Sequence, residues 1–377
     1  MEEKMTLNRE RFFISPFFVF FTIHGAQIGI GVLSFQRRLN EKVGHDGWIS
    51  VIVAGIVAHL LIWMMYQTFQ RSGTSKDVIQ LNVQYFGKWI GNALNIGLVC
   101  YFLLLALIVL RLYIEVVQVW MFPLMGTWQF SLILLLLTYY TVLGGFRSVV
   151  GLCVWGVLIP LFTLFPMLFF PLEYAHYRNF FPIFDHSVID VLKGAKEVTV
   201  EYLGFELLFM YYPFIKHGQQ SHRWAQWANG FTMLIYLVII FISTVFYNEE
   251  QVKHVIWPTL TLGKIPEIPF IERMEYIIIS IYVLVVFPII CLAIWSVTRG
   301  LKRMFSLKQR LSLPIVLIAI FIASLFFNTR EEIDQLGKFV STTGFYLVIG
   351  YIPFLYLLSL FMKRLKGKAS MNERSMI

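Results

Sequence analysis

The chain has 377 residues, of which 58% are hydrophobic and 14% are charged, and its formal net charge at pH 7 is +9. A soluble globular domain carries roughly 25% charged residues, so this chain has too few charged groups to cover the surface of a soluble particle of its size. The composition therefore predicts a polytopic membrane protein.

The lysines and arginines stand between apolar runs and do not gather into one binding face. A bias of these residues toward cytoplasmic loops is the usual cause of such a pattern, so we expect no nucleic-acid partner. The sequence also contains no glycine-rich phosphate loop, no zinc-protease motif and no nucleophile placed beside a base. We therefore expect no enzyme, no catalytic residues, no cofactor and no metal.

Ten apolar runs are candidates for spanning helices, which need about 20 apolar residues each. They place both termini on one side of the bilayer, and the loops on that side hold most of the basic residues, although Arg37 and Arg38 fall on the other. Both termini and a basic tail (363–377) are therefore predicted to be cytoplasmic. The ten runs, in chain order, are Phe12–Phe35, Trp48–Thr68, Trp89–Phe122, Trp128–Leu143, Gly151–Leu172, Val198–Ile215, Trp227–Tyr247, Glu275–Leu301, Leu311–Asn328 and Phe339–Met362.

The first run contains three glycines at its centre, Gly25, Gly29 and Gly31, with His24 and Gln27 beside them. Glycine lowers the preference for helix and lets backbone groups turn toward a ligand. The alternative is a packing face of small residues between two helices. The third glycine and the two polar side chains favour an unwound segment.

Two loops are long enough to have structure of their own, Glu173–Glu197 and Asn248–Arg273. The first is amphipathic and the second contains several prolines. Each is interpreted either as a short helix lying on the membrane surface or as a lid over an outer vestibule.

The sixth run is the weakest apolar run, because Glu201 and Glu206 interrupt it and Gly204 lies two residues before the second acid. A carboxylate at the centre of a bilayer costs about 2.5 kcal/mol or more unless it faces protein or water. Glu206 is therefore a candidate functional residue; the alternative is a buried acid that only joins two helices.

Breaks in the first and sixth of ten spans are typical of inverted-repeat transporters, whose ligand site lies between the repeats. Exposed N–H groups at half-helix ends suit a carboxylate, so a zwitterionic amino acid is a suitable ligand. We predict that backbone groups of residues 26–31 and 202–205 hold its charged ends.

The residues Gly25-Ala26-Gln27-Ile28-Gly29-Ile30-Gly31 resemble the first-helix signature of the amino acid–polyamine–organocation (APC) superfamily, and Leu203-Gly204-Phe205-Glu206 resembles its sixth-helix signature. The length, the ten runs and Gly144-Gly145-Phe146-Arg147 between the fourth and fifth runs resemble a narrower group. That group is the endospore germination proteins, the integral-membrane B subunits of nutrient germinant receptors. Relatives often have a proline after the first motif, where this chain has Ser34.

The resemblance implies an all-α, LeuT-like fold of two five-helix inverted repeats, residues 12–172 and 198–362, in a single integral membrane domain (1–377). It implies a place in the spore inner membrane, assembly with germinant receptor A and C subunits, and recognition of a small nutrient. In such a fold the third and eighth helices flank the broken ones. The ligand-binding residues expected from both arguments are Gly25, Ala26, Gln27, Gly29, Ile30, Gly31, Tyr101, Leu105, Tyr202, Leu203, Gly204, Phe205, Glu206, Cys291 and Ile294.

Three functions remain open at this point. The first is a subunit that senses a nutrient, most readily an amino acid, and passes a signal to partner subunits. The second is a secondary amino-acid transporter that uses the same site. The third is an ion or water pore gated by the ligand.

Overall fold

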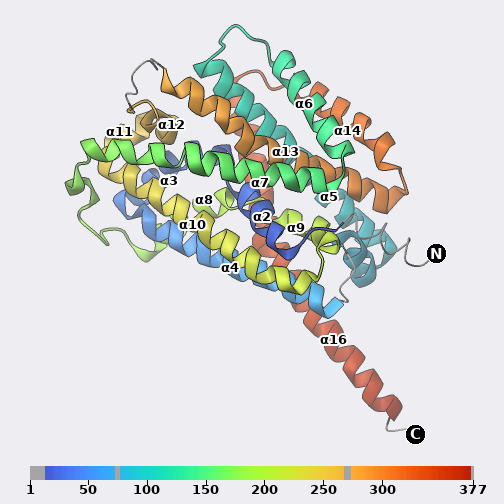
Figure 1. Ribbon diagram of the computed structural model, residues 1–377. Coiled ribbons are helices and arrows are strands. Elements are labelled where there is room, and N and C mark those ends of the chain that lie inside the picture. The colour runs from blue at the N-terminus through green and yellow to red at the C-terminus, as the bar shows by residue number, and fades with distance from the viewer. Residues whose placement is uncertain (1–12, 73–76, 267–272, 375–377) are drawn as a thin grey trace.

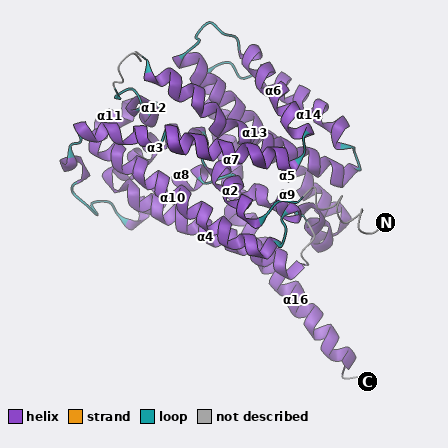
Figure 2. Ribbon diagram, viewed as in Figure 1, coloured by secondary structure: helices purple, strands orange, loops and turns teal. Residues whose placement is uncertain are grey.

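The computed structural model describes residues 13–72, 77–266 and 273–374, and every regular element in these ranges is a helix (Figures 1 and 2). The predicted all-α fold is therefore confirmed. Two shorter apolar helices, Thr127–Leu143 and Gln309–Ser324, accompany six stretches that are long and apolar enough to cross a membrane. The six are Phe35–Ser72, Val78–Trp120, Phe146–Tyr174, Gly218–Phe246, Met274–Phe305 and Arg330–Lys363.

The first half of the chain differs from the predicted runs mainly at helix ends. The third helix begins at Val78, earlier than its predicted start at Trp89. Gly87, with a φ of 76°, kinks it just before Trp89. The predicted start of the first run, Phe12, lies outside the described residues. The helices here are α2 (Val19–Gln27), α3 (Phe35–Val43), α4 (Gly47–Ser72), α5 (Val78–Trp120), α6 (Thr127–Leu143) and α7 (Phe146–Thr163).

The second half begins with a helix whose start differs from the predicted one. The sixth helix starts at Val188, capped by the Ser187 side chain, and not at Val198. Its first turns are amphipathic, which is also the pattern of a short helix on the membrane surface. The helices here are α8 (Val188–Glu201), α9 (Leu208–Tyr211), α10 (Ser221–Phe246), α11 (Glu249–His254), α12 (Pro258–Leu262), α13 (Met274–Phe305), α14 (Gln309–Ser324), α15 (Arg330–Tyr346) and α16 (Ile352–Arg374).

The long helix α13 forms the centre of the bundle, where it packs against α5 and α7. The pair α6 and α14 lies outside it (Figure 1), and the large apolar side chains on their outer faces are exposed, including Leu132, Leu136, Ile315 and Ile318. Apolar surface of this kind requires lipid in place of water. The composition and the packing thus give the same result, an integral membrane protein.

The second long loop forms α11 and α12, which lie at the end of the molecule opposite the projecting helix α16 (Figure 1). The Thr259 hydroxyl of α12 donates a hydrogen bond of 2.8 Å to the Val32 carbonyl oxygen. The loop is therefore packed on the protein, over the end of the first broken helix. Helix α16 runs into the basic tail, whose last three residues lie outside the described ranges.

Candidate functional site

The first span is broken directly after α2, as the glycines predicted. Ile28 and Gly29 adopt extended backbone conformations, a 3-10 turn follows at Ile30–Leu33, and α3 then begins at Phe35. A break inside a bilayer is tolerated only where the freed backbone groups find partners within the protein. The freed backbone groups between α2 and α3 therefore need hydrogen-bond partners on other helices.

Tyrosine hydroxyls supply these partners. Tyr282 of α13 donates a hydrogen bond of 2.5 Å to the Gly29 carbonyl oxygen. The Tyr236 hydroxyl of α10 lies 3.3 Å from the Gln27 carbonyl oxygen and 3.1 Å from that of Glu201, at the end of α8. Tyr236 therefore contacts the first and the sixth helix at the points where both unwind.

The sixth span is broken after Glu201, and Gly204 adopts a positive φ of 118°. A short 3-10 turn, Phe205–Leu207, leads into α9. Gly204 packs on the Ala26 carbonyl group so closely that a Cβ atom there would overlap its oxygen. The two breaks are thus in direct contact.

Glu206 holds the break of the sixth helix together. One carboxylate oxygen accepts a hydrogen bond of 2.7 Å from the Gly204 N–H, and the other accepts one of 2.7 Å from the Tyr101 hydroxyl of α5. The carboxylate is fully buried. Two predicted site residues, Tyr101 and Glu206, are therefore brought together at the break.

The Gln27 side chain points instead toward α10. Its amide nitrogen donates to Asn229 at 2.8 Å, and its oxygen accepts from Thr232 at 2.9 Å. The same Thr232 hydroxyl contacts His24 at 2.8 Å. These polar side chains join the first and seventh helices inside the membrane.

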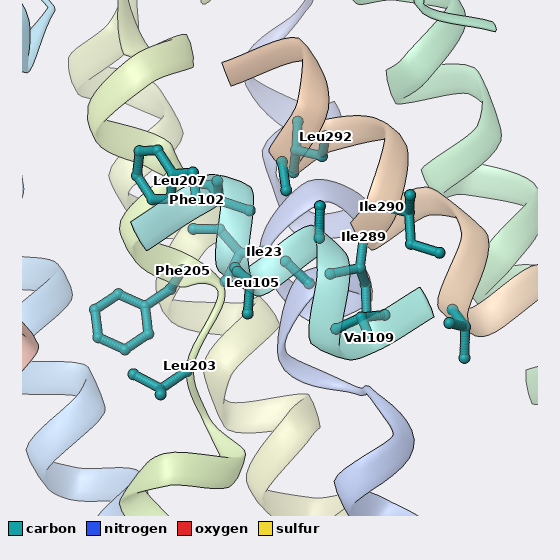
Figure 3. Packing of buried hydrophobic residues seen from close by; sticks show 14 of the residues in the cluster. Ile23, Phe102, Leu105, Val109, Leu203, Phe205, Leu207, Ile289, Ile290 and Leu292 are labelled. Atoms are coloured by element: carbon teal, nitrogen blue, oxygen red, sulfur yellow. The ribbon is translucent and has the colours of Figure 1, made fainter. Parts of the chain in front are cut away.

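Apolar side chains fill the space between α2, α5 and α13 beside the breaks, where Ile23, Leu105 and Ile289 lie near one another (Figure 3). Gly29 faces Ile289, and Gly25 faces Val157 of α7. Figure 3 also shows the extended chain between Leu203 and Phe205.

The other predicted residues are buried at different places. Cys291 lies near Thr138 of α6, with 3.9 Å between the sulfur and the hydroxyl oxygen, so its thiol lies beside α6. Tyr202 is oriented toward α4, with its hydroxyl 3.4 Å from the Val51 carbonyl oxygen. Ile30 and Ile294 belong to the buried core.

Two residues next to the breaks were missed by sequence reasoning. Arg38 of α3 forms an ion pair with Glu201, which links the halves of the first and sixth helices nearest to α11. The carboxylate of Glu201 fills the space beside Gly31, where a Cβ atom would overlap it. Gly344 of α15 lies against Leu203 and Tyr101. Arg38 had a signal, its position against the charge rule; Gly344 had none.

Removing the Arg38 guanidinium is expected to lower the stability of the protein, because it leaves the Glu201 carboxylate, 6% exposed, without its partner. Breaking a fully buried pair costs about 3–5 kcal/mol; Arg38 is half exposed, so a loss of about 2 kcal/mol is expected for Arg38→Ala. Thermal unfolding of the purified protein in detergent measures it. The control is Arg37→Ala, whose pair with Glu41 is exposed on both sides. Equal losses for both variants would contradict this assignment.

The ends of the broken helices nearest to α16 are joined by backbone groups. The Ile14 N–H donates to the Phe214 carbonyl oxygen and the Lys216 N–H donates to the Ile14 carbonyl oxygen, each at 2.9 Å. The first and sixth helices are thus tied at three depths: by Arg38–Glu201, by Gly204 on Ala26, and by this pair.

A cavity of about 120 Å³ lies beside the break of the first helix. Its lining is almost wholly apolar and comes from the first helix, α7, α10, α12 and α13, with Gly25, Ile28 and Tyr282 among the residues. Within the described part of the chain the sixth helix contributes nothing to this lining. The contact of Gly204 with the Ala26 carbonyl closes the two breaks against each other at that point, and the ligand residues expected there stay a prediction.

Sequence comparisons match one family of proteins over most of the chain. Residues 13–333 match the family described as spore germination protein. The chain is 40% identical over 345 residues to spore germination protein GerQB of Bacillus cereus, covering 92% of this chain and 95% of that protein. It is 23% identical over 333 residues to spore germination protein YndE of Bacillus subtilis (strain 168), covering 88% and 91% of the two chains.

The fold is also found among solved structures of other proteins. A Na⁺-coupled sialic acid symporter in a substrate-bound outward-open state aligns with a TM-score of 0.61 and 12% sequence identity, covering 93% of this chain and 76% of that one. The LeuT-like architecture implied by the resemblance is therefore confirmed.

Proposed function

Because the chain belongs to the spore germination protein family, we propose that it is the integral-membrane subunit of a spore germinant receptor and binds a small nutrient between its two broken helices. The contact between Gly204 and the Ala26 carbonyl carries this proposal. Two unwound segments that meet inside a bundle expose amides and carbonyls where no helix uses them, and such segments form the ligand sites of inverted-repeat transporters.

An amino acid matches the groups at this point. Its ammonium group would donate to the Glu206 carboxylate and to the carbonyl oxygens of Gln27 and Gly29, in place of the hydroxyls of Tyr101, Tyr236 and Tyr282 that occupy them. Its carboxylate would accept from the amides of the unwound segments. The tyrosines keep the polar backbone satisfied in the closed state and release it to a ligand that offers the same hydrogen bonds.

Signalling follows from the ties between the two helices. A ligand shifts an equilibrium only when it binds one conformation better than the other, and the closed breaks leave no room for it. Binding would therefore favour a state in which the first and sixth helices separate. Germinant receptor A and C subunits in the spore inner membrane would detect this change, with both termini of the chain in the cytoplasm. Residues 12–172 and 198–362 would move as the two repeats.

The second candidate is a secondary transporter of amino acids, which the fold shared with a Na⁺-coupled symporter favours. The two functions use the same site and differ in the step after binding. A transporter must release its ligand on the far side, whereas a sensor needs only to change its contact with partners.

Purified protein reconstituted in liposomes separates the two candidates. With a labelled mixture of the standard amino acids we expect saturable binding to the proteoliposomes without accumulation above the external concentration. Concentrative uptake under a Na⁺ or proton gradient would instead establish the transporter. Absence of both binding and uptake would contradict the nutrient site itself. Liposomes carrying the Gly204→Ala variant are the control.

A further inference from the structure

Four polar residues from three separate segments meet at the end of the molecule that carries α11 and α12. His45 and Asp46 end the 3-10 turn between α3 and α4, His186 stands just before α8, and Glu249 opens α11. Side-chain ligand atoms of the two histidines and Asp46 all lie within 4.8 Å of one another. Glu249 joins the group through a contact of 2.8 Å between its carboxylate and Nδ1 of His45.

The backbone builds this cluster firmly. Asp46 accepts hydrogen bonds from the N–H groups of Phe184, Asp185 and His186, at 2.9 to 3.1 Å, and its carboxylate lies 3.2 Å from Nδ1 of His186. The His45 N–H donates to Glu249 at 3.1 Å. Each imidazole therefore has one ring nitrogen beside a carboxylate oxygen, so that nitrogen and oxygen donors of the kinds that bind divalent metals stand side by side.

A second observation concerns the other side of the His45 ring. His45 is 8% exposed, and its Nε2 atom is buried without a hydrogen-bond partner. A small cavity of about 20 Å³, enough for about one water molecule, has His45, Gln36 and Ser243 among its lining residues. The side-chain amide oxygen of Gln36 and the Ser243 hydroxyl are also buried without a partner. A buried acceptor left without a donor is costly.

The neutral His45 ring can carry its single proton on either nitrogen. With the proton on Nδ1 the ring donates to Glu249; the alternative tautomer carries the proton on Nε2, on the far side of the ring from Glu249. With the proton on Nε2, two lone pairs, of Nδ1 and of Glu249, meet at 2.8 Å. A cation between Nδ1 and the carboxylates removes this repulsion and holds the ring in the tautomer with its proton on Nε2.

We propose that His45, Asp46, His186 and Glu249 form a binding site for a divalent first-row transition ion of the Zn²⁺ class. Two imidazoles and carboxylate oxygens are donors that Zn²⁺ accepts at about 2.0–2.2 Å in tetrahedral geometry, which requires ligand atoms about 3.4 Å apart. To reach it, the widest separation of 4.8 Å would shorten by about 1.4 Å, and the contacts of 2.8 and 3.2 Å would lengthen slightly. His186 and Glu249 are 27% and 49% exposed and give the ion a way in.

The bound ion would act as a clamp. It ties the turn between α3 and α4 to the start of α8 and the start of α11, and α3 and α8 carry the ion pair of Arg38 and Glu201. The same end of the two broken helices is thereby held closed. The proposal does not depend on the identity of the nutrient or on a signalling role.

Zn²⁺ titration of the purified full-length protein in detergent tests the site, with bound metal measured by elemental analysis after desalting. We expect one Zn²⁺ per chain, a higher unfolding temperature with Zn²⁺, and a loss of affinity of at least about tenfold in His186→Ala and in the double variant His45→Ala/His186→Ala. The matched control is His254→Ala, since His254 pairs with Glu250 on the exposed face of α11 without a second histidine. That variant should bind as the wild type does.

Two outcomes overturn the proposal. In the first, the wild type binds no Zn²⁺ beyond the level of the double variant; in the second, the double variant keeps full affinity. If His45→Ala unfolds, the test uses the more exposed His186 and Glu249. The variants His186→Asn and Glu249→Gln are expected to keep the wild-type unfolding temperature in metal-free buffer and to bind Zn²⁺ more weakly. Wild-type affinity in both of these variants would likewise rule the site out.

Discussion

Spores carrying Gly204→Ala are expected to lose the nutrient response, shifting the effective ligand concentration by more than about tenfold or abolishing germination. Two causes act together at this position. Alanine at a φ of 118° costs about 1–2 kcal/mol in the left-handed region, and its Cβ would overlap the Ala26 carbonyl oxygen, a backbone atom that cannot rotate away. Relieving this overlap displaces the backbone of both breaks, whose amides and carbonyls would hold the ligand. Loss of optical density of spore suspensions at graded nutrient concentrations measures the response.

Gly87→Ala is the matched control for this change. Gly87 also has a positive φ, 76°, but a Cβ there would meet nothing within 4 Å. The variant therefore has the conformational cost without the contact between the breaks, and we expect a near-normal response at normal protein levels by immunoblot. A wild-type response in Gly204→Ala, or an equal defect in both variants, would contradict the assignment of the site.

Neutralising Glu206 is expected to separate binding from folding. Glutamine has the shape of glutamate and can still accept from the Gly204 N–H and donate to the Tyr101 oxygen. The Glu206→Gln protein should therefore fold, while an ammonium ligand loses a charged hydrogen bond worth about 1.5–3 kcal/mol. The expected weakening of nutrient binding is about 10- to 150-fold. Equilibrium binding of labelled amino acids to the purified variant measures it.

Glu206→Ala and Tyr101→Phe complete this test. Alanine leaves the Gly204 N–H and the Tyr101 hydroxyl buried without an acceptor, at about 1–3 kcal/mol each, so its unfolding temperature should fall clearly below that of Glu206→Gln. Tyr101→Phe removes one hydrogen bond and keeps the carboxylate. Unchanged nutrient affinity in Glu206→Gln would show that Glu206 only joins α5 to the sixth helix, the packing role that a buried acid can have.

The two breaks could be predicted from the sequence because their causes are local. Gly25, Gly29 and Gly31 weaken a helix wherever they stand, and Glu206 in an apolar run marks a place that lipid cannot surround. The pairing of the breaks followed from their positions in the first and sixth spans. Local chemistry and position along the chain were sufficient for these features.

Other features depend on helices that are distant in sequence. Tyr236 and Tyr282 stand in apolar runs like many other tyrosines, and only the packing of α10 and α13 against the first helix shows which carbonyls they serve. The same holds for Gly344 against Tyr101. The start of the sixth helix at Val188 was missed because its first turns carry exposed polar residues such as Asp190 and Lys193, a pattern that a surface helix shares.

The backbone pair between Ile14 and the chain at Phe214–Lys216 has a consequence for observing the protein at work. Because main-chain atoms form this pair, substituting the side chains there leaves it in place. Hydrogen–deuterium exchange of the two amides is therefore the measurement that detects its opening. The Ile14 and Lys216 hydrogens should exchange at one common rate, set by how often the ends of the two helices nearest to α16 separate. A nutrient that separates these ends would accelerate the exchange of both hydrogens to the same extent.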